Sequence, residues 1–496
     1  MKTQLHSPAE AAVWLRGRVT GDLTIDSRQV QHGDGFIAWP GAALDGRRFV
    51  ADALNGGALA CLVEAQDSDQ FSLTDSRVAF YSGLKTAVAP IAAAYYRDPS
   101  HHLQTVAITG TNGKTSTAWW LAHALERVGR KSVVVGTLGI GSPSAMVSTG
   151  LTTPDPVVLQ RELRRFVDEG YVASAIEASS IGIAEHRLDA LHIKVAVFTN
   201  FSQDHLDYHP SMAHYWAAKA ALFEWPGLQS AVINVDDAKG ASLCAQLEQA
   251  GVEVWSVSFA KPARIRAQVT SEGVHGTTVE FVEHQERHSV LLASIGLFNV
   301  SNMLCVVGSL RALGVTLQAA IAACHALPAV PGRLNTIGFA GGPLVVIDYA
   351  HTPDALEKVL SALMPIAAKR AGQLWCVFGC GGDRDASKRP LMGEAAQRYA
   401  DQIVITSDNP RSENADAIIN QIIAGLTRTK VISVQPDRAK AIAETLRTAR
   451  SNDVILIAGK GHEDYQEVSG VKLPFLDRSH AQAALELRAD SKAVIA

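Results

Sequence analysis

The sequence contains no apolar run of about 18 residues, which is the length that a membrane-spanning helix needs. Its first residues, MKTQLHSPAEAAVWLRGRV, also lack the apolar core of roughly seven to fifteen residues that a secretory signal contains. We therefore expect a cytoplasmic protein that does not enter a membrane.

Cysteine is scarce, and its positions show no paired metal-binding spacing. Cys376 and Cys380 are the closest pair, but no second pair or group of histidines stands near them, which argues against a zinc site. Because buried thiols are common in reducing compartments, we interpret the cysteines as packing residues. They are Cys61, Cys244, Cys305, Cys324, Cys376 and Cys380.

Neither sign of charge is in large excess. The chain has 45 Lys and Arg residues against 49 Asp and Glu residues, a formal net charge of −4. This balance argues against nucleic acid or a membrane surface as the main partner, and it leaves small-molecule chemistry open.

The 496 residues predict about three domains, because domains usually contain roughly 100–200 residues. Residues 1–98 combine strand-like segments at 23–25 and 60–63 with a turn-rich segment at 33–49 and a helical end near 86–97. This combination is typical of a small α/β lobe.

Residues 99–333 form the predicted central domain. Apolar runs of the parallel-strand type alternate with longer amphipathic stretches, which predicts βαβ units around a buried parallel sheet. The runs are LQTVAIT, SVVVGTLG, VASAIEA, IKVAVFT and SAVINV. Alternating residues over 265–292 predict antiparallel hairpin strands, a side sheet that precedes a helix at about 299–313.

Residues 334–496 repeat the α/β alternation after the segment PAVPGRL. Strands are predicted at PLVVIDYA, LWCVFGCG, DQIVITSD, KVISVQ and DVILIAG, with helices that start near Pro353, Arg389, Asn414 and Pro436. Open α/β sheets bind ligands beyond the carboxyl ends of their strands, so the residues directly after these strands are candidates for a site.

The segment TVAITGTNGKTSTAWWLAHAL at 105–125 carries the strongest chemical signal, because a strand, a glycine-containing turn and a helix that opens with Lys-Thr can cradle a polyphosphate. Gly110 and Gly113 allow close approach, Lys114 neutralises phosphate charge, and Thr115 can bind magnesium. Ile108 breaks the strict P-loop pattern, which has glycine there. The alternative is an ordinary strand-to-helix turn with a surface lysine.

The shorter form TGTNGKT resembles the phosphate loop of the Mur ligases and of the related folylpolyglutamate synthetases. The resemblance covers nearly the whole chain, because further motifs follow in family order. They are LTIDSR at 23–28, TTP at 152–154, EASS at 177–180, NFSQDHLDYH at 200–209, FNVSN at 298–302, PGR at 331–333, DYAHTPDALE at 348–357, GCGGDRD at 379–385, DNPR at 408–411 and GKGHEDYQ at 459–466.

The resemblance implies an α/β protein of three domains: a central P-loop ATPase domain with a parallel sheet, a small N-terminal lobe that binds a UDP-sugar, and a Rossmann-like C-terminal domain that binds an amino acid. The implied ATP-binding residues are Gly110, Thr111, Asn112, Gly113, Lys114, Thr115, Ser116, Asn299, Asn302, Arg333, Asp348 and His351. Because Arg333 and the third domain must reach this nucleotide, we expect the domains to close when ATP binds.

The implied catalytic residues are Lys114, His205 and Lys219. The implied Mg²⁺ ligands are Thr115, Glu177, His205 and a carbamylated Lys219. Addition of CO₂ turns an ammonium into an anionic oxygen donor, which can hold magnesium where the cation would repel it. In isolation, His205 would be a hydrogen-bonded structural histidine and Lys219 a solvated surface lysine.

The resemblance also assigns two substrate sites. The UDP-sugar residues are Ile25, Ser27, Ala42, Ala43, Leu44, Thr152, Thr153, Ser179, Glu185 and Arg187. This chain departs from many relatives at Ile181, where they have histidine, and from some at Glu185, where they have glutamine. The residues for the incoming amino acid are Arg384, Asp408, Asn409, Pro410, Arg411, Gly459 and Glu463.

The implied reaction is the ATP-dependent addition of meso-2,6-diaminopimelate to the D-glutamate of UDP-N-acetylmuramoyl-L-alanyl-D-glutamate through an acyl phosphate, in peptidoglycan biosynthesis, by a monomer. DNPR is similar to the diaminopimelate type, since a guanidinium suits the carboxylate that lysine lacks. The alternatives are addition of lysine to the same nucleotide, glutamate addition to folate, or a protein that uses ATP as a switch or motor.

Overall fold

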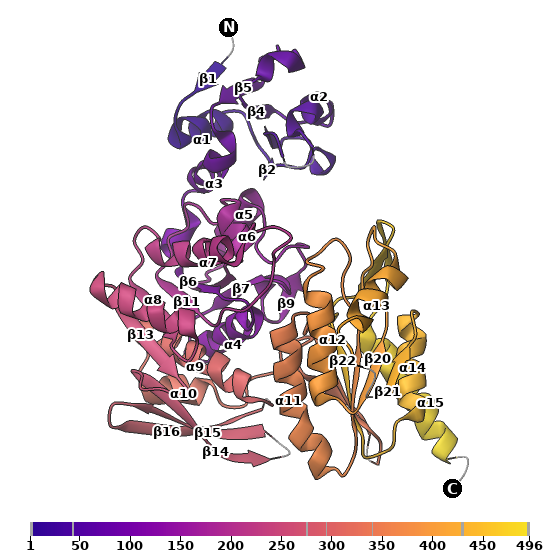
Figure 1. The fold of residues 1–496 in the computed structure, drawn as a ribbon. Coiled ribbons are helices and arrows are strands. Elements are labelled where there is room, and N and C mark those ends of the chain that lie inside the picture. Colours follow the sequence, from indigo (N-terminus) through magenta and orange to yellow (C-terminus); the bar gives the residue numbers. More distant parts are fainter. Residues whose placement is uncertain are drawn as a thin grey trace.

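The computed structural model describes residues 3–41, 44–273, 276–293, 295–339, 341–427 and 431–493. The sheets have five, eleven, six and two strands, and the three larger ones follow one another along the chain. In Figure 1 the N-terminal lobe lies at the top, the central domain at the lower left and the C-terminal domain at the lower right. The boundaries 1–98, 99–333 and 334–496 remain our proposal, and they leave one large sheet in each segment.

The N-terminal lobe is a parallel sheet with helices on both faces. Its strands, in sheet order, are β1 (Thr3–Leu5), β5 (Val78–Tyr81), β4 (Ala60–Glu64), β3 (Gly35–Ala38) and β2 (Leu23–Thr24). Its helices are α1 (Pro8–Arg16), α2 (Val50–Asn55) and α3 (Leu84–Tyr95). The prediction of turns over 33–49 was wrong for β3. Its four residues are all buried, and the glycine and aspartate before them conceal the strand from a composition argument.

The central domain contains the eleven-stranded sheet. Its strands, in sheet order, are β16 (Glu286–Leu292), β15 (Gly276–Glu283), β14 (Ile265–Gly273), β13 (Glu253–Ser258), β12 (Ser230–Asn234), β11 (Val195–Phe198), β6 (Gln104–Thr109), β10 (Ala173–Glu177), β7 (Ser132–Gly136), β8 (Gly139–Ser142) and β9 (Ala145–Val147). The five predicted parallel strands are confirmed.

Helices cover both faces of the central sheet. One core contains residues of α4 (Lys114–Arg127), α9 (Leu297–Ala312) and α10 (Leu317–Ala323). The other contains residues of α5 (Pro156–Asp168), α6 (Ser180–Ala184) and α8 (Ala238–Gln249). The strands β14 to β16 are antiparallel to one another, as predicted, but they are not a separate side sheet. Ile265 of β14 pairs with Val257 of β13, so the main sheet continues into them.

The C-terminal domain confirms the predicted α/β alternation. Its sheet runs β17 (Asn335–Ile337), β18 (Leu344–Asp348), β22 (Val454–Ala458), β19 (Leu374–Phe378), β20 (Gln402–Ile405) and β21 (Val431–Val434). Its helices are α11 (Pro353–Lys369), α12 (Lys388–Tyr399), α13 (Ala415–Ile423), α14 (Arg438–Thr448) and α15 (Asp477–Ala493). A hairpin of β23 (Tyr465–Val468) and β24 (Val471–Pro474) follows the sheet.

Two expectations from composition can be compared with this fold. All six cysteines are free and buried, which agrees with a packing role. Within the described ranges, no helix combines the length and the apolar character that crossing a membrane requires.

Candidate active site

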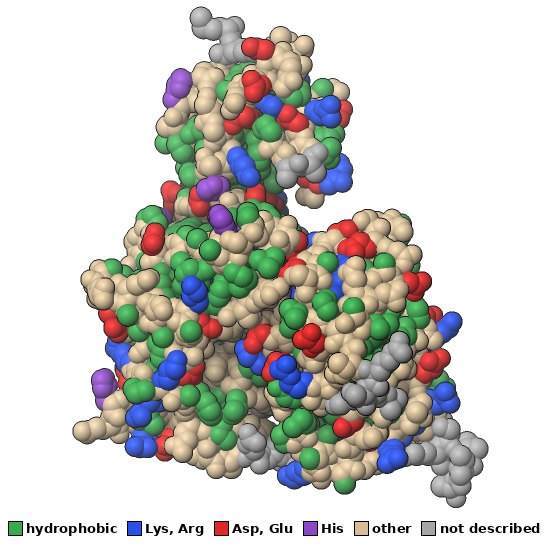
Figure 2. Space-filling view, viewed as in Figure 1, with side chains coloured by type: hydrophobic (Ala, Val, Ile, Leu, Met, Phe, Trp, Pro, Cys, Tyr) green, Lys and Arg blue, Asp and Glu red, His purple; other side chains and the backbone are tan. Residues whose placement is uncertain are grey.

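A cavity of about 2070 Å³ lies between the central and C-terminal domains. Figure 2 shows that the surface is also notched between the N-terminal lobe, at the top, and the C-terminal domain. The predicted site residues that line the cavity are Thr111, Asn112, Gly113, Lys114, Thr115, Ser116, Thr152, Thr153, Glu177, Ser179, Arg187, His205, Asn299, Asn302, Arg333, Asp348, His351, Arg384, Asp408, Asn409, Arg411, Gly459 and Glu463. Residues predicted for three different ligands therefore meet in one place.

The phosphate loop connects β6 to α4, where the sequence places it. Gly110 and Gly113 have φ angles of 145° and 87°, a region that favours glycine. A Cβ atom on Gly110 would lie 1.9 Å from Oγ1 of Thr199, and one on Gly113 would lie 2.2 Å from Oδ1 of Asn302. Both glycines are thus required by their surroundings as well as by their backbone conformation.

Two lysines converge on one carbonyl oxygen of this loop. Nζ of Lys114 donates to the oxygens of Gly110 and Thr111, each at 2.9 Å, and Nζ of Lys219 donates to the same Gly110 oxygen at 2.8 Å. Burial lowers the pKa of Lys114, and burial together with Lys114 lowers the pKa of Lys219 well below its ordinary value. An anion near the loop would therefore meet two amines whose charge no carboxylate of the described residues neutralises by direct contact.

Glu177 ends β10 and contacts the loop where α4 begins, whereas Lys219 contacts it at Gly110. Its Oε2 accepts from Oγ1 of Thr115 at 3.0 Å, and its Oε1 accepts from the backbone amide of Thr137 at 2.9 Å. Burial raises the pKa of Glu177. A Cβ atom on Gly136 would lie 2.1 Å from Oε1 of this carboxylate, so the neighbouring strand must have glycine there.

The donors Thr115 and Glu177 fit a magnesium ion, because Mg²⁺ prefers hard oxygen ligands and usually keeps oxygens from water and phosphate. In the described part of the chain, no three His, Cys, Asp or Glu side chains form a metal-binding group. A protein-only metal cage is therefore absent from those residues, and an ion here would need oxygens of the substrate.

His205 lies in the loop after β11 in a left-handed conformation, with a φ angle of 54°. Burial lowers its pKa to about 4, so the imidazole is neutral at pH 7. The pKa of its neighbour Asp204 is lowered: burial opposes this, but the positive charge of Lys388 favours the ionised carboxylate. Nζ of Lys388 is 3.4 Å from Oδ1 of Asp204, which links α12 of the C-terminal domain to the central domain.

The linker arginine reaches the phosphate loop, as predicted. Nη2 of Arg333 is 3.2 Å from Oγ1 of Thr115, and its guanidinium lies 4.4 Å from the ring centre of Tyr349. Asn112 of the loop donates to Oδ2 of Asp354, at the start of α11, at 2.8 Å. The two domains are therefore already in contact around the loop.

The remaining nucleotide candidates are buried near the same loop. Asn299 and Asn302 lie on α9, and Asn302 donates to Oδ1 of Asn299 at 3.4 Å. Asp348 ends β18 and accepts from the backbone amides of Leu334 and Ala350, each at 2.8 Å. Burial lowers the pKa of His351 to about 4, so this side chain is also neutral at pH 7.

The predicted UDP-sugar residues fall into two groups. The hydroxyl groups of Thr153 and Ser179 share a hydrogen bond of 2.9 Å, and the backbone oxygen of Thr153 accepts one from Arg187 at 3.0 Å. These residues line the cavity. Ile25, Ser27 and Leu44 do not.

The second group belongs to the N-terminal lobe. Leu44 is exposed by 63% of its surface, and Ala42 and Ala43 lie outside the described residues. Glu185 pairs with Lys85 of α3 at 2.8 Å and bonds to Tyr208, so it connects the lobe to the central domain. Four further predicted residues do not line the cavity: Gly110, Glu185, Lys219 and Pro410. Lys219 and Gly110 are joined by the hydrogen bond described above.

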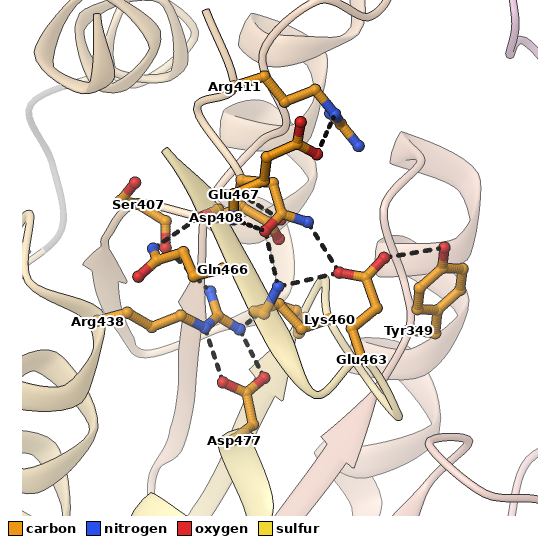
Figure 3. A network of polar contacts seen from close by, with 12 residues as sticks. Tyr349, Ser407, Asp408, Arg411, Arg438, Lys460, Glu463, Gln466, Glu467 and Asp477 are labelled. Atoms are coloured by element: carbon orange, nitrogen blue, oxygen red, sulfur yellow. Dashed lines mark hydrogen bonds and ion pairs between the residues drawn. The ribbon is translucent and has the colours of Figure 1, made fainter. Parts of the chain in front are cut away.

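Predicted amino-acid residues that follow β20 and β22 form a polar network at the carboxyl ends of these strands (Figure 3). Nδ2 of Asn409 donates to Oε2 of Glu463 at 2.9 Å. Arg411, in a left-handed conformation, donates to the oxygen of Gly382 at 2.7 Å and lies 3.6 Å from Glu467. Arg384 donates to the oxygen of Asp383 at 2.8 Å.

Lys460 is the centre of this network, and the sequence analysis missed it. The side chain is fully buried, and its Nζ is 3.0 Å from Oδ1 of Asn409 and 2.9 Å from Oε2 of Glu463. The lysine thereby fixes both side chains. Its place inside GKGHE, between two predicted residues, was the available signal.

Comparison with known proteins identifies the family. The chain matches the Mur ligase family catalytic domain over residues 21–96, the Mur ligase middle domain over 108–310 and the Mur ligase glutamate ligase domain over 332–461. It is 54% identical over 486 residues to the UDP-N-acetylmuramoyl-L-alanyl-D-glutamate--2,6-diaminopimelate ligase of Acidovorax sp. (strain JS42), with 97% of each chain covered. The chain belongs to the Mur ligase family.

Other relatives agree with this assignment. A ligase of the same description from Pseudomonas aeruginosa is 43% identical, with 97% of each chain covered. A solved structure of a UDP-N-acetylmuramoyl-L-alanyl-D-glutamate--2,6-diaminopimelate ligase is 33% identical, with a TM-score of 0.64 and coverage of 94% of this chain and 95% of that chain. The MurF ligase of Thermotoga maritima in complex with ADP shares the fold at 17% identity, with a TM-score of 0.68 and coverage of 95% and 99%. This Mur ligase is therefore an enzyme of an ATP-dependent family that acts on small molecules, and the three-domain α/β prediction is confirmed.

Proposed function

We propose that this Mur ligase uses ATP to join 2,6-diaminopimelate to the D-glutamate of UDP-N-acetylmuramoyl-L-alanyl-D-glutamate in peptidoglycan biosynthesis. One observation carries the proposal: the phosphate loop and the pocket around Asn409 and Arg411 open into the same cavity. ATP, the D-glutamyl carboxylate and the amine can thus meet without leaving it. The names of relatives that are 43–54% identical support the same choice of substrates.

The reaction has two steps. A carboxylate oxygen of D-glutamate bonds to the γ-phosphorus of ATP, and the bond from that phosphorus to the ADP oxygen breaks. The amine nitrogen then bonds to the acyl carbon, and phosphate and a proton leave. Such phosphoryl transfer depends mainly on positioning and on neutralisation of charge.

Each part of the cavity has a distinct task in this proposal. Lys114 turns from its own loop toward the β- and γ-phosphates, and Arg333 reaches them from the linker. Arg187, beside Thr153, binds the D-glutamyl carboxylate or the diphosphate. His205 is neutral and acts as a ligand or hydrogen-bond partner, because its lowered pKa excludes a cationic role at pH 7.

Magnesium is part of the proposal. Thr115 and Glu177 would hold one ion, His205 and a carbamate on Lys219 would hold a second, and both ions would supply neutralisation of phosphate charge. Burial and the nearby Lys114 favour the neutral amine of Lys219, which is the form that adds CO₂. Mass spectrometry of the protein and of its peptides at neutral pH, with and without bicarbonate, tests the modification. A gain in mass that is confined to peptides without Lys219 would exclude it.

Arg411 is proposed to select the amino acid. Diaminopimelate has a second carboxylate, which a planar guanidinium can bind through two hydrogen bonds. Lysine would leave the guanidinium without this carboxylate, so the pocket penalises lysine as well as rewarding diaminopimelate. The glycine and glutamate of GKGHE, Gly459 and Glu463, would bind the other polar groups of the amino acid.

The deciding experiment combines ATP, magnesium, the UDP-sugar dipeptide and either diaminopimelate or lysine, and then measures the mass of the product. A tripeptide that contains diaminopimelate is expected. A product with lysine alone would favour the related lysine ligase, and ATP hydrolysis without any amino acid would favour a switch or motor. Because ATP and a free nucleotide precursor are consumed, we propose that the enzyme works in the cytoplasm, and as a monomer.

A further inference from the structure

An ion pair is buried beneath the amino-acid pocket, where no substrate can touch it. Arg438 is the first residue of α14 and Asp477 the first residue of α15, and neither side chain has any exposed surface. Nε of Arg438 is 2.7 Å from Oδ1 of Asp477, and Nη2 is 2.8 Å from Oδ2. The carboxylate therefore binds the guanidinium through two parallel hydrogen bonds.

The guanidinium also contacts two loops of the pocket (Figure 3). Its Nη2 donates to the carbonyl oxygen of Ala458 at 2.9 Å, and its Nη1 donates to that of Ser407 at 3.4 Å. Ala458 is the last residue of β22 and immediately precedes Gly459, and Ser407 immediately precedes Asp408. One side chain thus binds the backbone directly before each half of the pocket.

These two loops do not come from neighbouring strands. β19 lies between β22 and β20 in the sheet, so no ladder of backbone hydrogen bonds fixes the spacing of the loops. The loops are nevertheless in tight contact, since a Cβ atom on Gly459 would lie 2.5 Å from Oδ2 of Asp408. Arg438 provides a direct link across the intervening strand.

Stability alone does not account for this pair. Removing two charges from water is costly, and apolar residues of similar size often serve a core equally well or better. Arg438 also has more partners than an ion pair between two helices would need, because both of its backbone contacts are at the pocket. A role in placing the pocket loops accounts for all four hydrogen bonds.

We propose that Arg438, held by Asp477, is a positioning residue that sets the spacing between Asp408–Asn409 and Gly459–Lys460 and thereby the fit of the incoming diamino acid. This inference rests on the proposed function, because it presumes that these loops bind the amino acid. It predicts that the fit of the amino acid, rather than that of ATP or the nucleotide sugar, depends on a residue that touches none of them.

The test measures kcat and KM for all three substrates by phosphate release, together with melting temperature. The variants are Arg438→Met, the conservative Arg438→Lys, and the double variant Arg438→Met with Asp477→Leu, which removes both charges. We expect Arg438→Met to raise the KM for diaminopimelate by roughly 10- to 100-fold, as a misplacement of about 1 Å can do, and to leave the KM for ATP within about twofold. The double variant should regain thermal stability, because no charge is left unpaired, but should keep the raised KM.

Arg311→Met is the matched control, because Arg311 forms a largely buried pair with Glu283 at 2.6 Å at the far end of the central domain. It should lower the melting temperature without a selective change in any KM. The inference is overturned if the double variant folds and binds diaminopimelate like the wild type, or if all three KM values rise together. If Arg438→Met does not fold, Arg438→Lys and the double variant decide the question in the same way. Failure of the wild-type enzyme to use any diamino acid would instead refute the proposed function.

Discussion

The two lysines that contact the phosphate loop and the lysine of the amino-acid pocket have opposite surroundings. Lys114 and Lys219 donate to backbone carbonyl oxygens, whereas Lys460 pairs with the carboxylate of Glu463. The first arrangement leaves the amines without a carboxylate partner among the described residues, so that Lys114 is available to an anionic ligand, whereas in the second the charge of Lys460 holds protein side chains in place. A lysine that must bind a transferring phosphate is therefore expected to be poorly neutralised by the protein, and a lysine that shapes a pocket is expected to be paired.

The largest effect should follow from Lys114→Met. Loss of a group that stabilises the charge of the transition state should lower kcat by on the order of 1,000-fold. The melting temperature should not fall, because a buried and incompletely neutralised amine is removed. Phosphate release and thermal melting check both parts, with the exposed Lys440→Met as control. A melting temperature that drops as far as that of a Lys460 variant would break the comparison.

Arg411→Met should come next. The ratio of kcat/KM for diaminopimelate to that for lysine should fall by about 100-fold, because the guanidinium no longer rewards the second carboxylate or penalises its absence. Arg411→Lys keeps the charge but not the planar guanidinium, so its ratio should lie between those of the wild type and Arg411→Met. An unchanged ratio would remove Arg411 from the specificity pocket.

Lys460→Met should raise the KM for diaminopimelate by roughly tenfold and leave the KM for ATP within about twofold. It should also destabilise the fold, since Glu463 and Asn409 lose their shared partner and a partly buried carboxylate is left unpaired. Substrate kinetics and thermal melting of the same preparations test this. An equal rise in the KM values for diaminopimelate and ATP would mean that Lys460 does not act on the amino-acid pocket alone.

Acid should weaken the fold by a moderate amount. Burial lowers the pKa of His462 from its ordinary value of 6.5 to about 4, so the unfolded chain takes up a proton between these pH values that the folded protein does not bind. Stability is therefore lost as the pH falls from about 6.5 towards 4. We expect the melting temperature to drop by several degrees over this window, and His462→Gln to drop less. If the melting temperatures of the wild type and of His462→Gln fell equally with pH, His462 would not be the source of the acid sensitivity.

The smallest effect is expected from Lys85→Gln. Its pair with Glu185 has side chains that are 48% and 28% exposed, so its loss should cost less than about 1 kcal/mol of stability. Thermal melting at low and high salt measures this, because an exposed pair is screened by salt and its loss should matter less in high salt. A drop in melting temperature as large as that of Lys460→Met would show that the exposure of an ion pair does not determine how much its lysine stabilises the fold.

Sequence patterns predicted the parts of the site whose geometry is local. The strand, glycine turn and helix around Lys114 form one continuous segment. The residues after β10 and β11 gather at one edge of the central sheet, and those after β18, β20 and β22 gather at one edge of the C-terminal sheet, because parallel strands end at the same edge of their sheet. Arg438 and Asp477 gave no such signal, since their pairing depends on the packing of two helices 39 residues apart. The continuation of the central sheet into β14 was missed for a related reason. Only two residue pairs join β13 to β14, and alternation of side chains does not reveal which strand is the neighbour.

The carbonyl oxygen of Gly110 has a consequence for the order of events. It accepts hydrogen bonds from both Lys114 and Lys219, so two ammonium groups on the same acceptor would repel each other. Departure of Lys114 towards a triphosphate and conversion of Lys219 to a neutral or anionic form each relieve that repulsion. If Lys114 binds the triphosphate as proposed, this single backbone atom would make the occupancy of the nucleotide site and the ionisation of Lys219 interdependent, although the two lysines lie on different helices.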